Sequence, residues 1–158
     1  DFRKRIVGKP YSIDHLNHAF EILKKYNIPL TFFNIVGFPD ETPELAYKTI
    51  EMNHRLVHDY DNNISTSASA FQPYYSTPLR KYCIRRGYIK ETDHPGDLIK
   101  DYILDMPQFP NDRVKGIART FALYVYLPRS MWPDIKVAEL MDEDGNAAFR
   151  ELRNKLQF

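Results

Sequence analysis

The segment from Asn34 to Pro43 has the clearest chemical potential, because a glycine and two acids stand between an apolar run and a helix start. Gly37 would let a ligand approach the backbone closely. In parallel α/β folds, ligands bind at the carboxyl ends of the strands, where this segment would lie. Asp40 and Glu41 place negative charge at the helix start and so disfavour a phosphate there. The alternative is a strand-to-helix turn that binds nothing.

A second candidate segment begins at Phe71 and continues through Gln72 and Pro73 into two tyrosines. It follows a run, from Ile64 onward, whose side chains are mostly Ser, Thr and Ala. If that run is a barrel strand, alternate small side chains would face the interior and leave room for substrate and cofactor. The alternative is that they pack against bulky neighbours.

Three segments, taken together, resemble radical S-adenosylmethionine (SAM) enzymes. Residues 34–42 (Asn-Ile-Val-Gly-Phe-Pro-Asp-Glu-Thr) are similar to the fifth-strand motif of that family, Gly-x-Ile-x-Gly-x-x-Glu. Residues 5–12 are similar to the stretch after the fourth strand, and residues 71–79 to the exit of the sixth. The three occur in family order and spacing. Two positions depart from the motif: Phe33 replaces its first Gly, and Glu41 comes one residue late.

The resemblance implies an α/β fold, the second half of a partial (β/α)6 TIM-like radical SAM barrel followed by a helical C-terminal extension. The barrel part would be residues 1–89 and the extension residues 90–158. Ile35 would pack on the adenine of SAM, and Gly37 would open space beside it. The residues that the resemblance places around the cofactor are Ile35, Val36, Gly37, Phe38, Phe71, Gln72 and Pro73.

The resemblance also implies cofactors that this chain cannot hold alone. The family binds a 4Fe–4S cluster through a Cys-x3-Cys-x2-Cys loop, and here Cys83 is the single cysteine. The chain also opens at Asp1 without an initiator Met. We therefore expect a fragment of a longer enzyme that cleaves SAM reductively and uses the deoxyadenosyl radical. The fragment itself would be inactive, with no catalytic or metal-ligating residue.

The second half of the chain has a related resemblance. Residues 104–107, 119–128 and 135–139 are similar to the C-terminal extension of radical SAM proteins that carry a cobalamin-binding domain. Cobalamin is therefore a candidate second cofactor of the parent enzyme. The alternative is a generic amphipathic helical cap, which the apolar periodicity supports by itself.

The elements expected to position these segments alternate in the first half. They are a helix capped by Ser12 and ending near Tyr26, a buried strand over 28–36, a helix from Thr42 to about His58, a strand over 64–71, and a helix from Thr77-Pro78 to Gly87. This alternation is typical of a parallel sheet or barrel. The expected remainder is an irregular stretch over 90–110, a helix capped by Asn111 that ends near Pro128, a helix after Trp132 broken at Gly145, and a short last helix.

The other polar clusters are expected to lie on the protein surface and to take no part in catalysis or metal binding. His54 and His58 are spaced to share a helix face but have no third ligand, so we expect a solvated face, as for His15 and His18. Cys83 is expected to be a packed or half-exposed thiol. The basic cluster of Arg80, Lys81, Arg85 and Arg86 is expected to be a solvated helix face rather than an RNA site.

The composition limits the classes of partner that this chain is expected to bind. The net charge of +1 creates no field that attracts nucleic acid or an anionic membrane, and no apolar run is long enough to cross a bilayer. We expect a cytoplasmic protein that acts on a small-molecule or peptide substrate. A half-barrel would expose a strand edge, which predicts self-association. The competing hypothesis is a non-redox α/β binding or interaction module.

Overall fold

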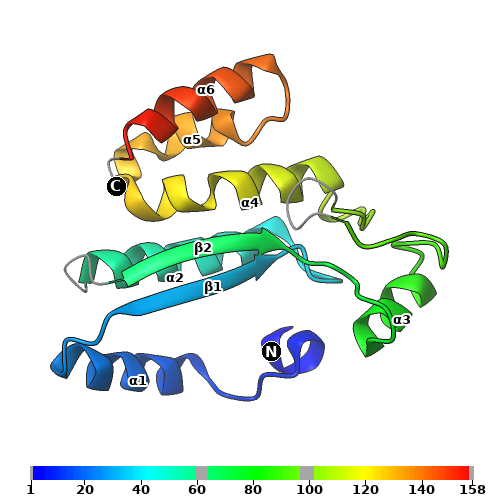
Figure 1. Cartoon of the computed structure of the whole chain (residues 1–158), viewed down its shortest axis with the longest axis horizontal. Coiled ribbons are helices and arrows are strands. Elements are labelled where there is room, and N and C mark those ends of the chain that lie inside the picture. Colours follow the sequence, from blue (N-terminus) through cyan, green and yellow to red (C-terminus); the bar gives the residue numbers. More distant parts are fainter. Residues whose placement is uncertain (1, 60–63, 97–101, 157–158) are drawn as a thin grey trace.

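The computed structural model describes residues 2–59, 64–96 and 102–156 (Figure 1). Its elements are a π-helical turn η1 (Arg3–Val7), α1 (Ile13–Lys25), β1 (Leu30–Val36), α2 (Pro43–Asp59), β2 (Ile64–Ala70), α3 (Pro78–Arg85), α4 (Asn111–Tyr126), a 3-10 turn η2 (Arg129–Met131), α5 (Trp132–Ala138) and α6 (Glu143–Asn154). In the described part, no helix combines the length and apolar character that crossing a membrane requires.

The two strands form a parallel pair joined by α2. Their register runs from Leu30 opposite Ile64 to Val36 opposite Ala70. A parallel pair needs a crossover, and α2 supplies it. The predicted α/β class and the alternation of strand and helix are therefore confirmed. The described sheet has these two strands.

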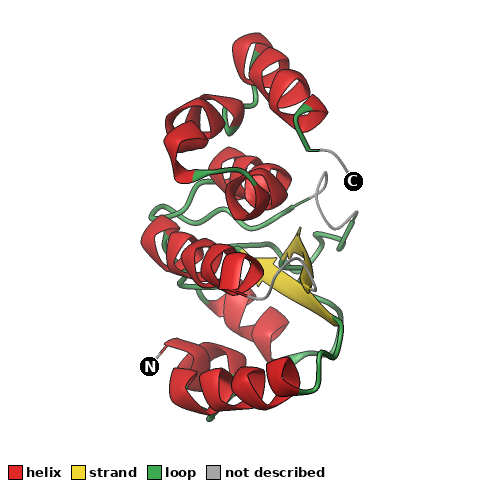
Figure 2. Ribbon diagram, turned by 90° about the vertical axis from the view of Figure 1, so that its left-hand side faces the viewer, coloured by secondary structure: helices red, strands yellow, loops and turns green. Residues whose placement is uncertain are grey.

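Helices cover one face of this sheet. On that face Phe32 meets Phe20 of α1 edge-to-face at 5.2 Å, and Asn34 hydrogen bonds with Asn53 of α2. The opposite face carries Phe33, which is 83% exposed, and Ile35, which is 45% exposed. In Figure 2 the right-hand side of the strands carries loops and no helix among the described residues. The expectation of a fully buried β1 is therefore wrong, because only alternate side chains meet a helix.

The second half of the chain adds a layer to the covered face. Helix α4 packs against α2 and β2, and the largest buried side chains, such as Phe109, Phe121 and Tyr124, come mainly from α4 and the segment before it. At the outer edge of β2, the hydroxyl of Tyr126 accepts a hydrogen bond of 2.8 Å from the Thr66 backbone N–H. The helical region thus completes the core of the first half.

A buried acid holds the helical layers together. Glu139, at the end of α5, accepts hydrogen bonds from Tyr47 of α2 and Tyr124 of α4 and pairs with Lys136 at 3.1 Å. Its backbone lies so close to α4 that a Cβ on Gly116 would meet the Glu139 carbonyl oxygen at 2.1 Å. Glu139 therefore joins three helices.

Helix boundaries confirm some caps and correct others. The side chains of Ser12 and Thr77 accept the cap hydrogen bonds of α1 and α3, as predicted. Asn111 does not cap α4, since its amide donates instead to the Tyr102 carbonyl at 2.5 Å. Gly145 does not break a helix but lies in the first turn of α6, where a Cβ would overlap the Leu140 carbonyl. Residues 97–101 of the expected irregular segment lie outside the described part.

The one-sided burial of β1 predicts that alanine substitutions at two adjacent phenylalanines change the free energy of unfolding by unequal amounts. Phe32→Ala removes a ring packed on Phe20 and is expected to lower the free energy of unfolding by about 2–3 kcal/mol. Phe33→Ala removes an exposed ring and is expected to change it by less than about 0.5 kcal/mol. Urea denaturation followed by circular dichroism measures both. Equal losses would contradict the assignment of the two faces.

Candidate functional site

The turn after β1 is closed by a buried carboxylate. Glu41 is 4% exposed, and its Oε2 accepts hydrogen bonds from the backbone N–H groups of Gly37 at 2.5 Å and Phe38 at 3.0 Å. Two residues of the turn have positive φ, Gly37 at 81° and Asp40 at 63°. The turn therefore uses its own acid to satisfy the N–H groups that an anion could have bound.

Gly37 permits a close approach, but the group that approaches belongs to the chain itself. A Cβ on Gly37 would meet Val114 of α4 at 2.6 Å and the Tyr102 ring at 2.9 Å. The Tyr102 hydroxyl also donates a hydrogen bond of 2.9 Å to the Gly37 carbonyl. The space beside Gly37 that was predicted for a ligand is therefore filled by Tyr102 and Val114.

Asp40 faces the opposite direction, toward α3 and the segment that follows it. Its carboxylate accepts hydrogen bonds from Tyr82 at 2.5 Å and Tyr88 at 2.7 Å and pairs with Arg86 at 3.2 Å. Burial opposes ionisation, but the tyrosine hydrogen bonds and the Arg86 charge outweigh it and lower the pKa of Asp40. Asp40 therefore anchors α3 to the turn as a carboxylate.

The seven residues predicted around the cofactor do not share one cavity. Ile35 lies on the open sheet face, whereas Val36 is buried on the helix-covered face. The Phe38 ring packs on Phe71 at 4.9 Å between centroids. The buried Pro73 offers its carbonyl to Arg80 at 3.0 Å. The structure thus brings Phe38 and Phe71 together and leaves Ile35 apart on the bare face.

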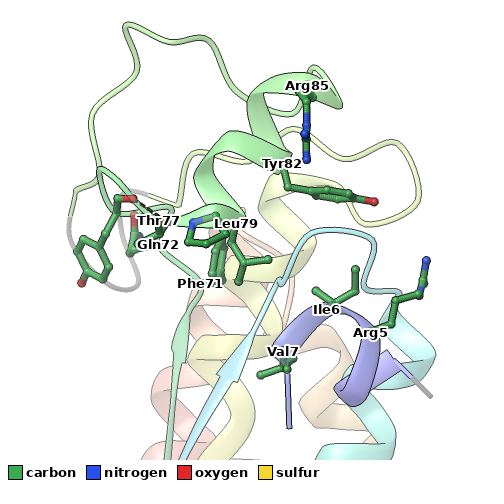
Figure 3. A pocket seen from close by; sticks show the side chains of 12 residues that line it. Arg5, Ile6, Val7, Phe71, Gln72, Thr77, Leu79, Tyr82 and Arg85 are labelled. Atoms are coloured by element: carbon green, nitrogen blue, oxygen red, sulfur yellow. Dashed lines mark hydrogen bonds between the residues drawn. The ribbon is translucent and has the colours of Figure 1, made fainter. Parts of the chain in front are cut away.

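One cavity of about 730 Å³ opens at the carboxyl end of β2 (Figure 3). Residues 5–8 of the N-terminal turn form one wall, and residues 77–79, 82 and 85 of α3 and its cap form another. Phe71, Gln72 and Tyr74 complete it. Of the predicted cofactor residues, Phe71 and Gln72 therefore line this cavity. The N-terminal turn and the segment that follows β2, two of the three segments that carry the resemblance, meet here.

Two polar side chains that we expected on the surface are buried. Arg80 is 5% exposed and donates to the carbonyls of Pro73, Glu91 and Asp93, so it fixes the loops around the cavity. His54 is also buried, and its Nδ1 lies 3.1 Å from the carbonyls of Tyr124 and Val125. The expectation of solvated faces is wrong for both. Helical spacing could have shown this, because Arg80 and His54 align with the buried residues Cys83 and Ile50.

The described residues offer no site for an iron–sulfur cluster. Cys83 is fully buried, and burial raises the pKa of its thiol to about 11, so it stays protonated near neutrality. Among the described residues, no three His, Cys, Asp or Glu side chains are grouped to hold a metal ion. Cluster ligation requires several thiolates, so the residues present do not fit that group.

Comparison with known proteins finds distant relatives. An uncharacterized methyltransferase of Pyrococcus horikoshii is 24% identical over 152 residues, which cover 96% of this chain and 31% of that protein. An uncharacterized protein of Methanocaldococcus jannaschii is 32% identical over 57 residues, which cover 36% of this chain and 11% of that protein. The chain thus spans less than a third of the length of either relative. No family model and no solved structure matches.

The buried Glu41 predicts a pH-dependent stability. Burial raises its pKa from 4.5 to about 7, although the two backbone hydrogen bonds oppose the shift. The folded chain then keeps this proton to higher pH than the unfolded chain, so the contribution of Glu41 to stability falls as pH rises through this window. Glu41→Gln keeps an acceptor for both N–H groups. As pH rises from 4.5 to about 7, we expect the free energy of unfolding of the variant to increase by up to about 3 kcal/mol relative to that of the wild type.

Urea denaturation at several pH values measures this difference. Glu44→Gln is the control, because Glu44 lies exposed in the same segment. A hydrogen bond with Thr42 lowers the pKa of Glu44, so its contribution to stability rises with pH instead of falling. A pH profile of Glu41→Gln that runs parallel to the wild type would contradict the prediction.

Because other side chains lie close to Gly37, we expect a side chain at this position to lower the free energy of unfolding more than one at Gly87 does. The φ angles are similar, 81° and 71°, so the backbone strain of alanine is comparable. Only at Gly37 would the new Cβ overlap Val114 and Tyr102, since no described atom lies within 4 Å at Gly87. We expect Gly37→Ala to cost about 2 kcal/mol more than Gly87→Ala in thermal or urea unfolding. Equal costs would show that Tyr102 and Val114 move aside freely.

Proposed function

We propose that this chain is the second half of a partial (β/α)6 barrel of a radical SAM enzyme, with its open sheet face lining the barrel interior. The observation that carries the proposal is the bare face of β1 and β2. Helices cover the other face of these parallel strands, which is the arrangement of a barrel wall. The strand-to-helix turn with the family motif follows β1 directly.

The composition of the bare face supports an interior role. Phe33 and Ile35 lie beside Ser67 and Ser69 of β2 in the parallel register. Exposed apolar side chains on a sheet face mark a surface that meets a ligand or further protein. Small serine side chains next to them leave space above the strands. In the proposed barrel, this space holds cofactor and substrate.

The outer edge of β1 supports the same arrangement. Among the described residues, β1 pairs with β2 alone, so one edge of the strand is open. In the proposed barrel an upstream strand pairs with this edge. A chain without that strand exposes both the edge and Phe33, which favours self-association in isolation.

The proposed roles of individual residues follow from their positions. Ile35 offers an apolar surface to the adenine of SAM near the carboxyl end of β1. Phe71 and Gln72 border the adenosyl group where β2 ends. Gly37 acts indirectly, because Tyr102 and Val114 occupy the space beside it and Glu41 takes its N–H. Substrate identity and the outcome of the reaction depend on residues beyond this chain.

The name of the relative from P. horikoshii agrees with an enzyme that uses SAM, since it is called a methyltransferase. In the proposed enzyme, a cluster held elsewhere in the longer protein supplies reductive cleavage of SAM. This chain provides binding surface and no step of the redox chemistry. That the longer protein also binds cobalamin stays a prediction.

The proposal is tested by comparing the 158-residue chain with the longer protein that contains it. Anaerobic reconstitution with iron and sulfide is expected to give an iron–sulfur absorption band in the longer protein only. With a chemical reductant, the longer protein should then release the deoxyadenosine product of SAM cleavage, detected by chromatography. A longer protein that binds no cluster would overturn the proposal and favour a non-redox binding module.

A matched pair of variants in the longer protein tests the role of Ile35. Ile35→Asp is expected to raise the KM for SAM about tenfold or more, because a charge would replace the apolar contact with adenine. Ile22→Asp in α1 is the control, since Ile22 and Ile35 are similarly exposed, at 47% and 45%. The same KM for both variants would place the adenine elsewhere.

A further inference from the structure

Two histidines lie side by side near the C-terminal end of α2. His54 and His58 are one helical turn apart, and their ring centroids are separated by 4.2 Å. His58 is exposed, whereas His54 is buried under the end of α4 and beside Trp132 of α5. Two histidines four residues apart on a helix are the arrangement through which many metalloproteins hold one ion. Neither histidine lines the cavity at the end of β2 or lies on the open sheet face.

The hydrogen bonds of His54 determine which of its ring nitrogens is free. Nδ1 lies 3.1 Å from the carbonyl oxygens of Tyr124 and Val125, which only accept, so Nδ1 carries the proton and donates. Burial, together with the nearby His58 and Arg129, lowers the pKa of His54, so Nε2 keeps its lone pair near neutrality. A neutral imidazole that donates its other N–H to a backbone carbonyl is the form in which histidine binds metals.

Both histidines are accessible to an ion from solvent. Within the described part of the chain, Nε2 of His54 has no hydrogen-bond partner, and it is not among the fully enclosed polar atoms. His58 forms no hydrogen bond or ion pair with another described residue. Because the His58 side chain is exposed, its ring can turn toward an ion beside His54 without displacing packed atoms. The pair therefore offers two imidazole nitrogens to one ion.

The charges around the pair nearly cancel. Arg129 lies over the Trp132 ring at 4.7 Å, and its positive charge opposes the binding of a cation. Glu51, three residues before His54 on α2, pairs with Arg129 at 3.9 Å and reduces this effect. Arg55 is directed toward α1, where it donates to Asn17. No third ligand side chain joins the two histidines among the described residues, so water would complete the coordination.

We propose that His54 and His58 together bind one divalent transition-metal ion, with water in its remaining coordination positions. Imidazole nitrogens suit Zn²⁺, Ni²⁺ and Cu²⁺, whereas Mg²⁺ and Ca²⁺ favour oxygen ligands. His54 is hydrogen bonded to α4 and packed on α5, so the ion stabilises the contact between α2 and these two helices.

This site is independent of the proposed radical SAM chemistry. An iron–sulfur cluster requires several thiolates, and the histidine pair offers none. The pair lies at the contact of α2 with α4 and α5, away from Phe33 and Ile35 of the open sheet face. Either proposal can therefore fail without the other.

The single tryptophan of the chain reports on this site, because the Trp132 ring lies 5.5 Å from the His54 ring. Ni²⁺ bound to the two histidines is expected to quench the fluorescence of Trp132 with a saturating titration curve. Excess Zn²⁺, which does not quench, should displace Ni²⁺ and restore the emission. Mg²⁺ should neither quench the emission nor displace Ni²⁺.

Three variants test the assignment of the ligands. His58→Asn removes an exposed side chain and is expected to weaken Ni²⁺ binding about tenfold or more. His18→Asn is the matched control, since His18 is an exposed histidine of α1, and it should bind Ni²⁺ as the wild type does. Arg129→Gln removes the opposing charge and is expected to tighten binding about threefold.

Thermal unfolding gives a second measurement. Zn²⁺ is expected to raise the melting temperature of the wild type and of His18→Asn, but not that of His58→Asn. The proposal is overturned if His58→Asn binds Ni²⁺ as tightly as the wild type, or if His18→Asn weakens binding equally. Failure of Ni²⁺ to quench Trp132 in the wild type would also overturn it.

Discussion

The hydrogen bonds from the Gly37 and Phe38 N–H groups to the Glu41 carboxylate close the junction between β1 and α2. A carboxyl group this deeply buried is tolerated because it meets backbone donors that would otherwise be unpaired. Its neighbour Asp40 faces α3 and fixes Tyr82 of that helix. Two adjacent acids thus orient the strand end, α2 and α3 relative to one another. The cavity wall formed by α3 depends on this arrangement.

The sheet is covered on one side, and this asymmetry links structure to the proposed function. Phe32 and Asn34 meet helices, whereas Phe33 and Ile35 meet none among the described residues. Two strands alone bury little surface, so α4 is needed to complete the core on the covered face. No helix of the described part adds such a layer to the bare face. An enzyme barrel would use that face for cofactor and substrate.

Several polar residues stabilise the interior in roles that their residue types alone do not indicate. Arg80 binds three loop carbonyls, His54 lies under the end of α4, and Glu139 joins α2, α4 and α5. Each charged or polar group is buried with partners, as the cost of burying it requires. Such residues were expected on the surface, yet their hydrogen bonds connect several elements of the core. The correct signal was their alignment with apolar residues on the same helix.

Local sequence patterns determined the helices and strands of this protein, because caps, prolines and apolar periodicity act over a few residues. Ser12, Thr77 and Pro43 mark helix starts that the structure confirms. The parallel pairing was also foreseen from the alternation of elements. Only the tertiary structure decided which face of β1 is bare and that Tyr102 and Val114 fill the space beside Gly37. These features depend on contacts between residues distant in the chain, which no local pattern encodes.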